Sequence, residues 1–272
     1  MTDGTRPHET TPAYGPAEVR VGTSGYSFED WRGTFYPQKI DKGKMLDYYV
    51  LHFPTVEINS TYYRIPHSAV MSNIARKAPE GFDFMVKVPQ SFTHRRTDLD
   101  GDLGDYSECL KPLQDTGRLS GLLAQFPWSF KFSDNALDYV SQVARALAPN
   151  PLFVEFRHQS WVNRQMYDRL RSEKIGYVCV DEPQLPNLLA PDAFATTDTA
   201  YIRLHGRNAA RWWDGGPLRY DYSYSQQELN EWKQKVRKLQ NKVKRVYVFF
   251  NNCHEGQAVG NAREFVELLR KV

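Results

Sequence analysis

Eight short apolar segments recur along the chain, each about as long as a β-strand and each followed by polar residues. They are rich in Val, Phe, Tyr and Ile, which favour extended backbone. Helix-like or loop-like sequence separates them. The pattern therefore predicts eight strands, at residues 19–24, 56–59, 82–88, 122–126, 152–157, 177–181, 200–205 and 246–251.

Apolar residues at helical spacing fill most of the connections between these segments. Two helix starts carry clear signals. Ser133 is followed by an acidic residue in the first turn, and Ser225 with Glu228 has the spacing of a capping box. The sixth connection, residues 182–199, contains three prolines and lacks a helical pattern. Helices are expected at residues 43–53, 68–77, 106–114, 133–147, 163–174, 225–241 and 261–270.

The alternation of strands and helices predicts an α/β protein with a single (β/α)8 barrel of the TIM type. Residues 19–272 would form this domain, since such barrels typically have about 250 residues. Residues 1–18, rich in Thr, Pro and Gly, would form a disordered tail. Long loops are expected after the third and seventh strands, at 89–105 and 206–224. A doubly wound open sheet is the alternative, but the turn after the first strand lacks the GxGxxG pattern that would favour it.

Composition and charge narrow the classes of function. Hydrophobic residues make up 41% of the chain and charged residues 25%, ordinary proportions for a water-soluble globular protein. The net charge of +3 is too small for general binding to nucleic acid, so an anion site must be local. The three cysteines are far apart, no apolar run is long enough to span a membrane, and the start lacks an apolar leader. These features predict free thiols, a cytoplasmic location and no membrane partner.

Charged side chains occupy one face of the predicted strands, at their C-terminal ends. Successive side chains of a strand point to opposite faces, and in a barrel one face points to the axis. Burying charges there costs several kcal/mol per ion unless they pair, so these residues predict a binding or catalytic site. The alternative is a self-satisfied network of ion pairs that fills the barrel. The predicted axial residues are Glu57, Asn59, Lys87, Gln125, Glu155, Arg157, Asp181, Arg203, His205 and Asn251.

Each type of axial side chain has an expected role. Carboxylates and an imidazole transfer protons once neighbouring charges tune their pKa values. The candidate catalytic residues are Glu57, Glu155, Asp181 and His205. Cationic side chains are expected to hold an anion, and amides to orient the substrate through hydrogen bonds. These binding residues are Lys87, Arg157, Arg203, Asn59, Gln125 and Asn251.

Aromatic and basic residues follow the strand ends in the predicted loops. Such a mixture suits bases or sugars that stack on rings while Arg side chains hold phosphates. The alternative is that these rings cover the top of the barrel. The loop residues expected to bind substrate are Tyr26, Tyr62, His158, Trp161, Arg207 and Asn252, with Trp212 and Trp213 as the stacking platform for nucleic acid.

Four of these residues have side chains that could ligate a metal ion. Glu155 and His158 have a Glu-x-x-His spacing, and Asp181 and His205 lie on neighbouring strand ends. Carboxylate and imidazole ligands suit zinc or manganese. The neighbouring cations would repel a divalent ion and pair with the carboxylates, so no metal or other cofactor is expected.

Eight phrases at the strand ends form a characteristic set: VGTSGYSFEDWRGTFYP (21–37), VEINSTYYRIP (56–66), FMVKVP (84–89), AQFP (124–127), VEFRHQSW (154–161), VCVDEP (178–183), YIRLHGR (201–207) and VYVFFNNCHEGQAVGNA (246–262). Together they resemble the YecE-like family, domain of unknown function 72. The resemblance covers nearly all of residues 19–272. It implies a TIM-type barrel and no particular function, because the family has no established activity.

The family is similar in fold to class IV apurinic endonucleases, barrels that cut DNA at abasic sites with a cluster of metal ions. Glu155 and His158 are similar to the acid-x-x-His ligand pair of those enzymes. Glu57, Lys87 and Gln125 stand where His, His and Glu would be expected. The comparison therefore implies a hydrolase acting on phosphodiester bonds, but without the full metal cluster.

The predicted function is binding of a phosphate-containing ligand at the C-terminal mouth of the barrel. That ligand would be nucleic acid, a nucleotide or a sugar phosphate, and phosphodiester hydrolysis is the reaction that the endonuclease comparison adds. The alternatives are a non-catalytic nucleic-acid-binding protein and a metal-dependent sugar isomerase or epimerase. Phosphate bound in the mouth would favour anion binding, whereas a coordinated metal ion would favour the metal-dependent readings.

Overall fold

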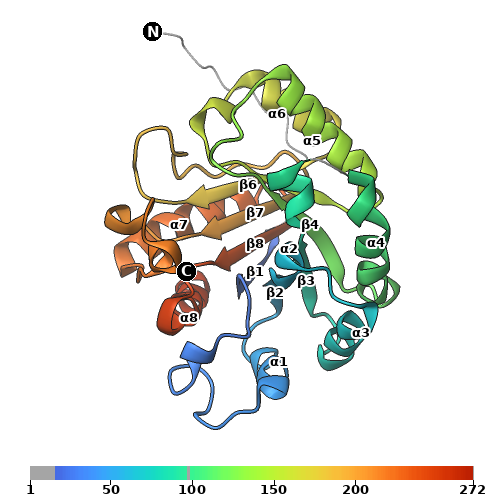
Figure 1. Ribbon diagram of the computed structural model, residues 1–272. Helices are drawn as coiled ribbons and strands as arrows, with labels where there is room; N and C mark the ends of the chain where they lie inside the picture. The colour runs from blue at the N-terminus through green and yellow to red at the C-terminus, as the bar shows by residue number, and fades with distance from the viewer. Residues whose placement is uncertain (1–15, 97–98, 272) are drawn as a thin grey trace.

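Eight parallel strands form the centre of the molecule (Figure 1). A computed structural model describes residues 16–96 and 99–271. One sheet has the order β1-β8-β7-β6-β5-β4-β3-β2, and among the described residues a single bridge between Ser24 and Glu57 joins β1 to β2. The sheet therefore curls into the predicted (β/α)8 barrel, nearly closed along that seam. The strands are β1 Glu18–Thr23, β2 Thr55–Ile58, β3 Asp83–Lys87, β4 Leu119–Gln125, β5 Leu152–Glu155, β6 Gly176–Asp181, β7 Thr199–Leu204 and β8 Arg245–Phe250.

Helices lie around the outside of the strands (Figure 1). The expected caps are present: the Ser133 hydroxyl accepts a hydrogen bond from the Ala136 amide, and Ser225 and Glu228 form a capping box. The β6–β7 connection contains no helix among its residues, all of which are described. The helices are α1 Met45–Tyr49, α2 Ser60–Tyr63, α3 Ser68–Lys77, α4 Leu99–Asp115, α5 Asp134–Ala146, α6 Arg164–Ser172, α7 Gln226–Gln240 and α8 Gln257–Arg270.

Two helices begin earlier than the sequence pattern predicts. Helix α4 begins at Leu99, so most of the loop expected at 89–105 is a π turn at Ser91–Arg95 followed by helix. Acidic residues in the first turn favour this start, and the glycines among them obscure the apolar pattern. Helix α8 begins at Gln257, directly after Gly256 in the left-handed conformation. The long loop predicted after β7 is present, with 3-10 turns at Ala209–Arg211 and Gly216–Tyr220.

Aromatic rings fill the lower part of the barrel axis. Phe153 of β5 packs against Tyr201 of β7, with ring centroids 5.3 Å apart. A side chain at Gly176 of β6 would overlap the Phe153 ring, so the glycine makes room for it. Gly22 of β1 likewise allows close approach to β2, because a Cβ atom there would overlap the Thr55 carbonyl group. The lower barrel is thus a packed floor beneath the charged strand ends.

The start of the barrel lies slightly earlier than predicted. Residues 1–15 of the predicted disordered tail lie outside the described residues. Ala17 is buried and its amide donates to the Gln240 carbonyl at 3.0 Å, and β1 begins at Glu18, so both belong to the barrel. Within the part of the chain that the structure describes, no helix is both long enough and apolar enough to cross a membrane.

Candidate ligand site at the barrel mouth

A buried ion-pair network lies on the axis at the C-terminal ends of the strands. Arg203 of β7 donates from Nε and Nη2 to the two carboxylate oxygens of Glu57, at 2.8 and 2.7 Å. Its Nη1 donates to Glu155 at 2.6 Å, and Tyr201 donates its hydroxyl hydrogen to Glu57. The predicted convergence of Glu57, Glu155 and Arg203 is thereby confirmed. Their mutual pairing means that much of their charge is already satisfied.

Glu155 is the centre of this network. Its carboxylate also accepts a hydrogen bond from Arg157 Nε, and its Oε1 lies 3.3 Å from His205 Nε2. Burial alone would raise the pKa of Glu155, but the Arg157 and Arg203 guanidinium groups outweigh burial and hold that pKa well below its usual range. Glu155 is therefore a stable carboxylate at neutral pH and a poor proton donor.

His205 is neutral in this setting. Burial and the nearby Arg157 guanidinium lower its pKa to about 3, despite the neighbouring Glu155 carboxylate. Asn251 Nδ2 lies 2.9 Å from His205 Nδ1 and can donate to it. With Nδ1 as acceptor, the proton of the neutral ring sits on Nε2, facing Glu155. Asn251 and His205 thus lie at the predicted mouth, but as members of one hydrogen-bonded set.

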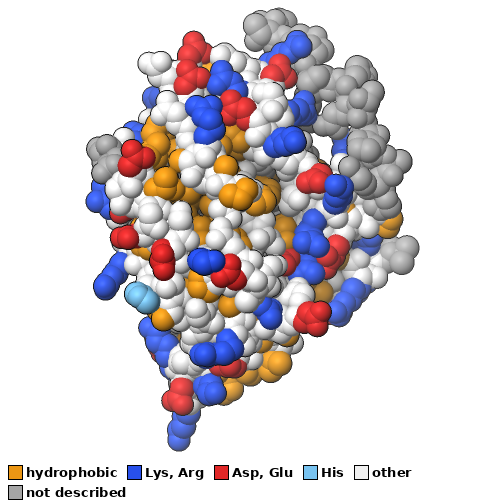
Figure 2. Space-filling view, turned by 90° about the vertical axis from the view of Figure 1, so that its right-hand side faces the viewer, with side chains coloured by type: hydrophobic (Ala, Val, Ile, Leu, Met, Phe, Trp, Pro, Cys, Tyr) orange, Lys and Arg blue, Asp and Glu red, His pale blue; other side chains and the backbone are white. Residues whose placement is uncertain are grey.

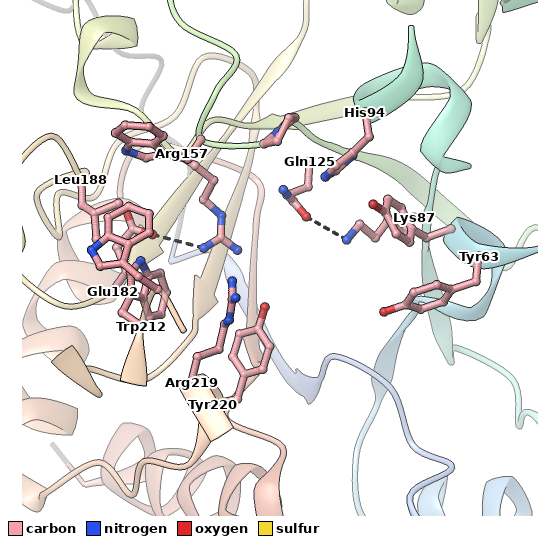
Figure 3. A pocket seen from close by; sticks show the side chains of 14 residues that line it. Tyr63, Lys87, His94, Gln125, Arg157, Glu182, Leu188, Trp212, Arg219 and Tyr220 are labelled. Atoms are coloured by element: carbon pink, nitrogen blue, oxygen red, sulfur yellow. Dashed lines mark hydrogen bonds and ion pairs between the residues drawn. The ribbon is translucent and has the colours of Figure 1, made fainter. Parts of the chain in front are cut away.

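Glu182 belongs to the mouth although it is absent from the predicted site. It follows β6 directly, accepts from Arg157 Nη1 at 3.2 Å and from the Leu189 amide at 2.9 Å, and is fully buried. Figure 3 shows it facing Arg157 across the cavity wall. Burial raises the pKa of Glu182 to about 7, with the Arg157 guanidinium only partly offsetting the effect. This carboxyl group therefore exchanges protons near neutral pH.

Asp181 points away from the axis, so its predicted place among the axial residues is wrong. Its carboxylate accepts from Arg207 Nε and Nη2, at 2.8 and 2.7 Å, and from the indole nitrogen of Trp232 on α7. Arg207 also pairs with Glu228 of α7 at 3.0 Å. Asp181 and Arg207 consequently fasten β6 and the loop after β7 to helix α7, outside the barrel.

Two other predicted binding residues are packed outside the mouth. Trp161 is fully buried, stacks on Phe156 with ring centroids 3.8 Å apart, and donates from its indole nitrogen to the Phe130 carbonyl. Asn252 is also fully buried and donates to Asn261 of helix α8 at 2.9 Å. Both follow strand ends, but Trp161 packs among aromatic residues near the ends of β4 and β5, and Asn252 turns toward helix α8. Their predicted contact with substrate is therefore wrong.

His158 and Tyr26 also lie apart from the cavities. The His158 ring accepts from the Ser160 amide at 3.1 Å and packs against Trp128 with centroids 5.2 Å apart. Tyr26 packs against Tyr49, with ring centroids 6.2 Å apart. Neither lines the two cavities described below. The predicted roles of both in substrate binding have no support in the geometry.

Two adjoining cavities open at the mouth, of about 300 and 480 Å³. Figure 3 shows the first, with side chains from the strand ends facing those of the loop after β7. The residues that line both cavities are Tyr63, Lys87, Gln125, Arg157, Arg219 and Tyr220. The first is completed by Tyr62, His94, Pro127, Trp128, Glu182, Leu188, Trp212 and Trp213. The second is completed by Ser24, Phe28, Asn59, Arg203, Gly216, Pro217, Asn251 and Cys253.

Lys87, the last residue of β3, lies between the two cavities. Its Nζ donates to Gln125 Oε1 at 2.9 Å, drawn as a dashed line in Figure 3, and lies 4.3 Å from the centre of the Tyr62 ring. Burial lowers the pKa of Lys87 to about 7, and the nearby Arg203 guanidinium contributes. His94 packs against the same Tyr62 ring, and burial together with Lys87 lowers its pKa to about 4.

The two tryptophans of the predicted stacking platform differ in exposure. Trp213 is 53% exposed and meets Trp128 edge to face, with centroids 5.4 Å apart. Trp212 is only 3% exposed, and the Arg157 guanidinium lies 5.8 Å from its ring centre. Trp213 therefore has a free ring surface at the rim, whereas Trp212 supports the cavity wall.

The four candidate metal ligands are not brought together. Glu155 and His205 are neighbours on the axis, Asp181 lies outside the barrel, and His158 turns toward Trp128. In residues 16–96 and 99–271, no group of three or more His, Cys, Asp and Glu side chains has the geometry to hold a metal ion. The four side chains that the sequence suggested as possible metal ligands therefore do not form one site.

Fold and mouth together define a (β/α)8 barrel with a cation-rich cavity at the C-terminal ends of its strands. The family model described as "Protein of unknown function DUF72" matches residues 20–272, and the chain belongs to this family. The resemblance inferred from the strand-end phrases is thereby confirmed.

The chain is similar to several members of that family. It is 31% identical over 269 residues to "UPF0759 protein YunF" of Bacillus subtilis (strain 168), covering 92% of this chain and 94% of the relative. A crystal structure of a DUF72 family protein from Thermotoga maritima MSB8 has 43% identity and a TM-score of 0.86, covering 93% of this chain and 99% of the other. One from Enterococcus faecalis V583 has 27% identity and a TM-score of 0.85, covering 94% and 96%. The names of these relatives state no ligand.

Proposed function

We propose that the protein binds a small organic molecule carrying a phosphate group, such as a nucleotide or a sugar phosphate, in the two cavities at the barrel mouth. One observation carries the proposal. Lys87, Arg157 and Arg219 line both cavities, and Glu182 is the one carboxylate among the lining residues. Because the pKa of Glu182 is raised to about 7, part of its negative charge is lost at neutral pH.

Arg219 is the cation best placed to meet a ligand. Its Nε donates to the Gly216 carbonyl at 3.1 Å, and within the described residues it has no ion pair with a carboxylate. Arg157, by contrast, already pairs with Glu155 and Glu182. A phosphate in the cavity would give Arg219 a bidentate partner of the kind guanidinium groups prefer.

Cavity size and ring surfaces support a small molecule more than a polymer. Volumes of about 300 and 480 Å³ suit a compact ligand. Tyr220 and Trp213 offer ring surfaces for a base or a sugar. Trp212, the other residue of the predicted stacking platform, is buried and has no free ring surface for a base. Figure 2 shows the side of the molecule on which α3 and α4 lie, where Lys and Arg side chains are interspersed with Asp and Glu, so this side offers no continuous basic track for a nucleic-acid strand.

Binding is the part of the predicted function that the geometry favours over phosphodiester hydrolysis. Glu57 and Glu155, two of the candidate catalytic residues, are both held by Arg203. A third, Asp181, faces helix α7. These carboxylates have no free position from which to activate water, so hydrolysis receives no support from them.

Calorimetric titration at low and moderate salt tests this proposal. The probes are inorganic phosphate, AMP and glucose 6-phosphate, with adenosine and glucose as matched neutral compounds and a labelled single-stranded oligonucleotide as a polymer. AMP or glucose 6-phosphate should bind, and its neutral counterpart should not. Arg219→Gln should weaken binding about 10- to 100-fold, the loss expected for charge-assisted hydrogen bonds. Arg211→Gln, an exposed position in the same loop that does not line the cavities, is the matched control.

Two results would contradict the proposal. Equal affinity for the neutral and phosphorylated members of a pair would show that the cations do not select the ligand. Binding of the oligonucleotide without binding of either small phosphate compound would favour the nucleic-acid reading instead.

A further inference from the structure

We propose that Lys87 is a covalent attachment site, whose side-chain amine condenses with the carbonyl group of an aldehyde or ketone held in the mouth to form an imine. The expectation that this carbonyl compound also carries a phosphate group rests on the function proposed above. The imine itself rests on the surroundings of Lys87.

The first observation is where Lys87 lies. It is the last residue of β3, and its side chain lines both cavities rather than the outer surface. In barrels of this type the C-terminal strand ends are where reacting groups gather. The amine is therefore reachable by a molecule in either cavity while its stem is held by the strand.

The second observation is the chemistry of its partners. In the part of the chain that the structure describes, the Lys87 amine forms no ion pair, and its one hydrogen bond is to the Gln125 side-chain carbonyl. The Tyr62 ring, whose centre lies 4.3 Å from the amine, is also uncharged. The carboxylates on the axis, Glu57 and Glu155, are both held by Arg203. A lysine that served only to balance charge would pair with one of them.

Gln125 orients the amine without blocking it. Its Nε2 donates to the Phe126 carbonyl at 2.8 Å, which fixes the amide so that Oε1 faces Lys87. An acceptor of this kind engages an N–H bond and leaves the nitrogen lone pair free for attack. Burial and the Arg203 guanidinium lower the pKa of Lys87 to about 7, so a large fraction of the amine is uncharged at neutral pH.

The reaction balances without an oxidant, a reductant or a further reactant. The Lys87 nitrogen forms a bond to the carbonyl carbon as the carbonyl π electrons move to oxygen, and a proton passes from nitrogen to that oxygen. The hydroxyl group of this adduct then leaves as water with a second proton, and a carbon–nitrogen double bond forms. Glu182 lines the same cavity and, with a pKa of about 7, is a proton donor for the departing oxygen.

The test uses pyridoxal 5′-phosphate and 5′-deoxypyridoxal, two aldehydes on the same ring of which only the first carries a phosphate group and neither of which can close to an internal hemiacetal. Each is incubated with the full chain, reduced with borohydride and followed by intact mass and peptide mapping. We expect one reduced adduct per chain at Lys87, formed faster with pyridoxal 5′-phosphate. Its rate should rise with pH through about 7, whereas an ordinary lysine titrates near pH 10.

Three variants complete the design. Lys87→Met should reduce labelling at least tenfold. Lys87→Arg should reduce it equally, because arginine forms no imine with these aldehydes, but it keeps a positive charge that can hold the phosphate group. Lys131→Met removes an exposed lysine beside Trp128 near the cavity and should label like the parent protein. Circular dichroism confirms that each variant is folded before its labelling is compared.

The outcomes separate the two proposals. Labelling of Lys87 at equal rates by both aldehydes would support the imine and contradict the phosphate preference. Labelling spread over surface lysines, or unchanged in a folded Lys87→Arg variant, would overturn the imine. If calorimetry with Lys87→Arg still detects AMP or glucose 6-phosphate in that case, the proposed function stands alone.

Discussion

Arg203 forms a bidentate ion pair with Glu57, donating from Nε and Nη2 to the two carboxylate oxygens at 2.8 and 2.7 Å. Both side chains are almost completely buried, and Glu155 completes the group. The charges on the axis therefore stabilise one another before any ligand arrives. This arrangement realises the ion-pair network that the sequence left open as an alternative to a catalytic site.

Arg203→Met should destabilise the protein by about 3–5 kcal/mol, because it leaves the Glu57 and Glu155 carboxylates buried without their partner. Urea unfolding of the parent and the variant measures the difference. Adding Glu57→Gln to the variant removes one unpaired charge and should restore part of the loss. A loss below about 1 kcal/mol, the range of an exposed ion pair, would contradict the buried network.

Replacing the two tryptophans of the loop after β7 should have different effects. Trp212→Ala should destabilise the fold by about 3–5 kcal/mol, because it leaves a large hole in a buried position. Trp213→Ala should leave stability nearly unchanged and weaken the binding of AMP, whose base would lose a ring surface. Thermal unfolding and calorimetry on both variants test the pair. Equal losses of stability would show that both rings are packing residues.

Glu182 should give the protein a pH-dependent stability that Glu182→Gln removes. Its pKa is about 7 in the folded protein against 4.5 as the reference, so the folded state binds this proton more tightly. The stabilisation is complete below pH 4.5 and is lost as the pH rises through about 7. Between pH 5 and pH 8 the unfolding free energy of the parent should fall relative to the variant by about 2–3 kcal/mol, at about 1.4 kcal/mol per pKa unit. Urea unfolding across that range measures it, and parallel curves would contradict the assignment.

Asp181→Ala should affect stability and leave ligand binding alone. The carboxylate lies outside the barrel, where it holds Arg207 and Trp232. Its removal should cost about 1–3 kcal/mol for the lost charge-assisted hydrogen bonds, while Arg207 keeps Glu228 as a partner. Affinity for AMP or glucose 6-phosphate, measured by calorimetry on the folded variant, should match the parent. A selective loss of affinity would return Asp181 to the site.

Strand alternation predicts most of the axis but fails on β6. On β2, β3 and β5 the charged residue at the strand end points to the axis, so Glu57, Lys87 and Glu155 all lie at the mouth. On β6 the apolar residues Val178 and Val180 face the axis, where barrels also accept aliphatic side chains. The sequence of β6 is therefore compatible with either face pointing to the axis. The prediction assigned Asp181 to the axial face, and for that reason it missed Glu182, the next residue, whose side chain lines the mouth.

Loop residues beyond the strand ends are less predictable because no periodicity fixes their direction. Trp161 and Asn252 each follow a strand end, yet they pack against Phe156 and helix α8. Arg219, in contrast, reaches both cavities from the middle of a long loop. Its only sequence signal is its position among the aromatic and basic residues of that loop. Such directions depend on tertiary contacts that local sequence does not encode.

The loop at 206–224 is held by hydrogen bonds near both of its ends. Near its start, Arg207 is tied to Asp181, and near its end the Tyr222 and Tyr224 amides donate to Gln257 and Asn261 of helix α8. The residues between these anchors supply one wall of the cavity. Apart from the buried Trp212, residues of this wall can be replaced without breaking the hydrogen bonds that anchor the loop. Grafting a segment of different sequence between the two anchors is therefore the direct way to change the selectivity of the proposed site.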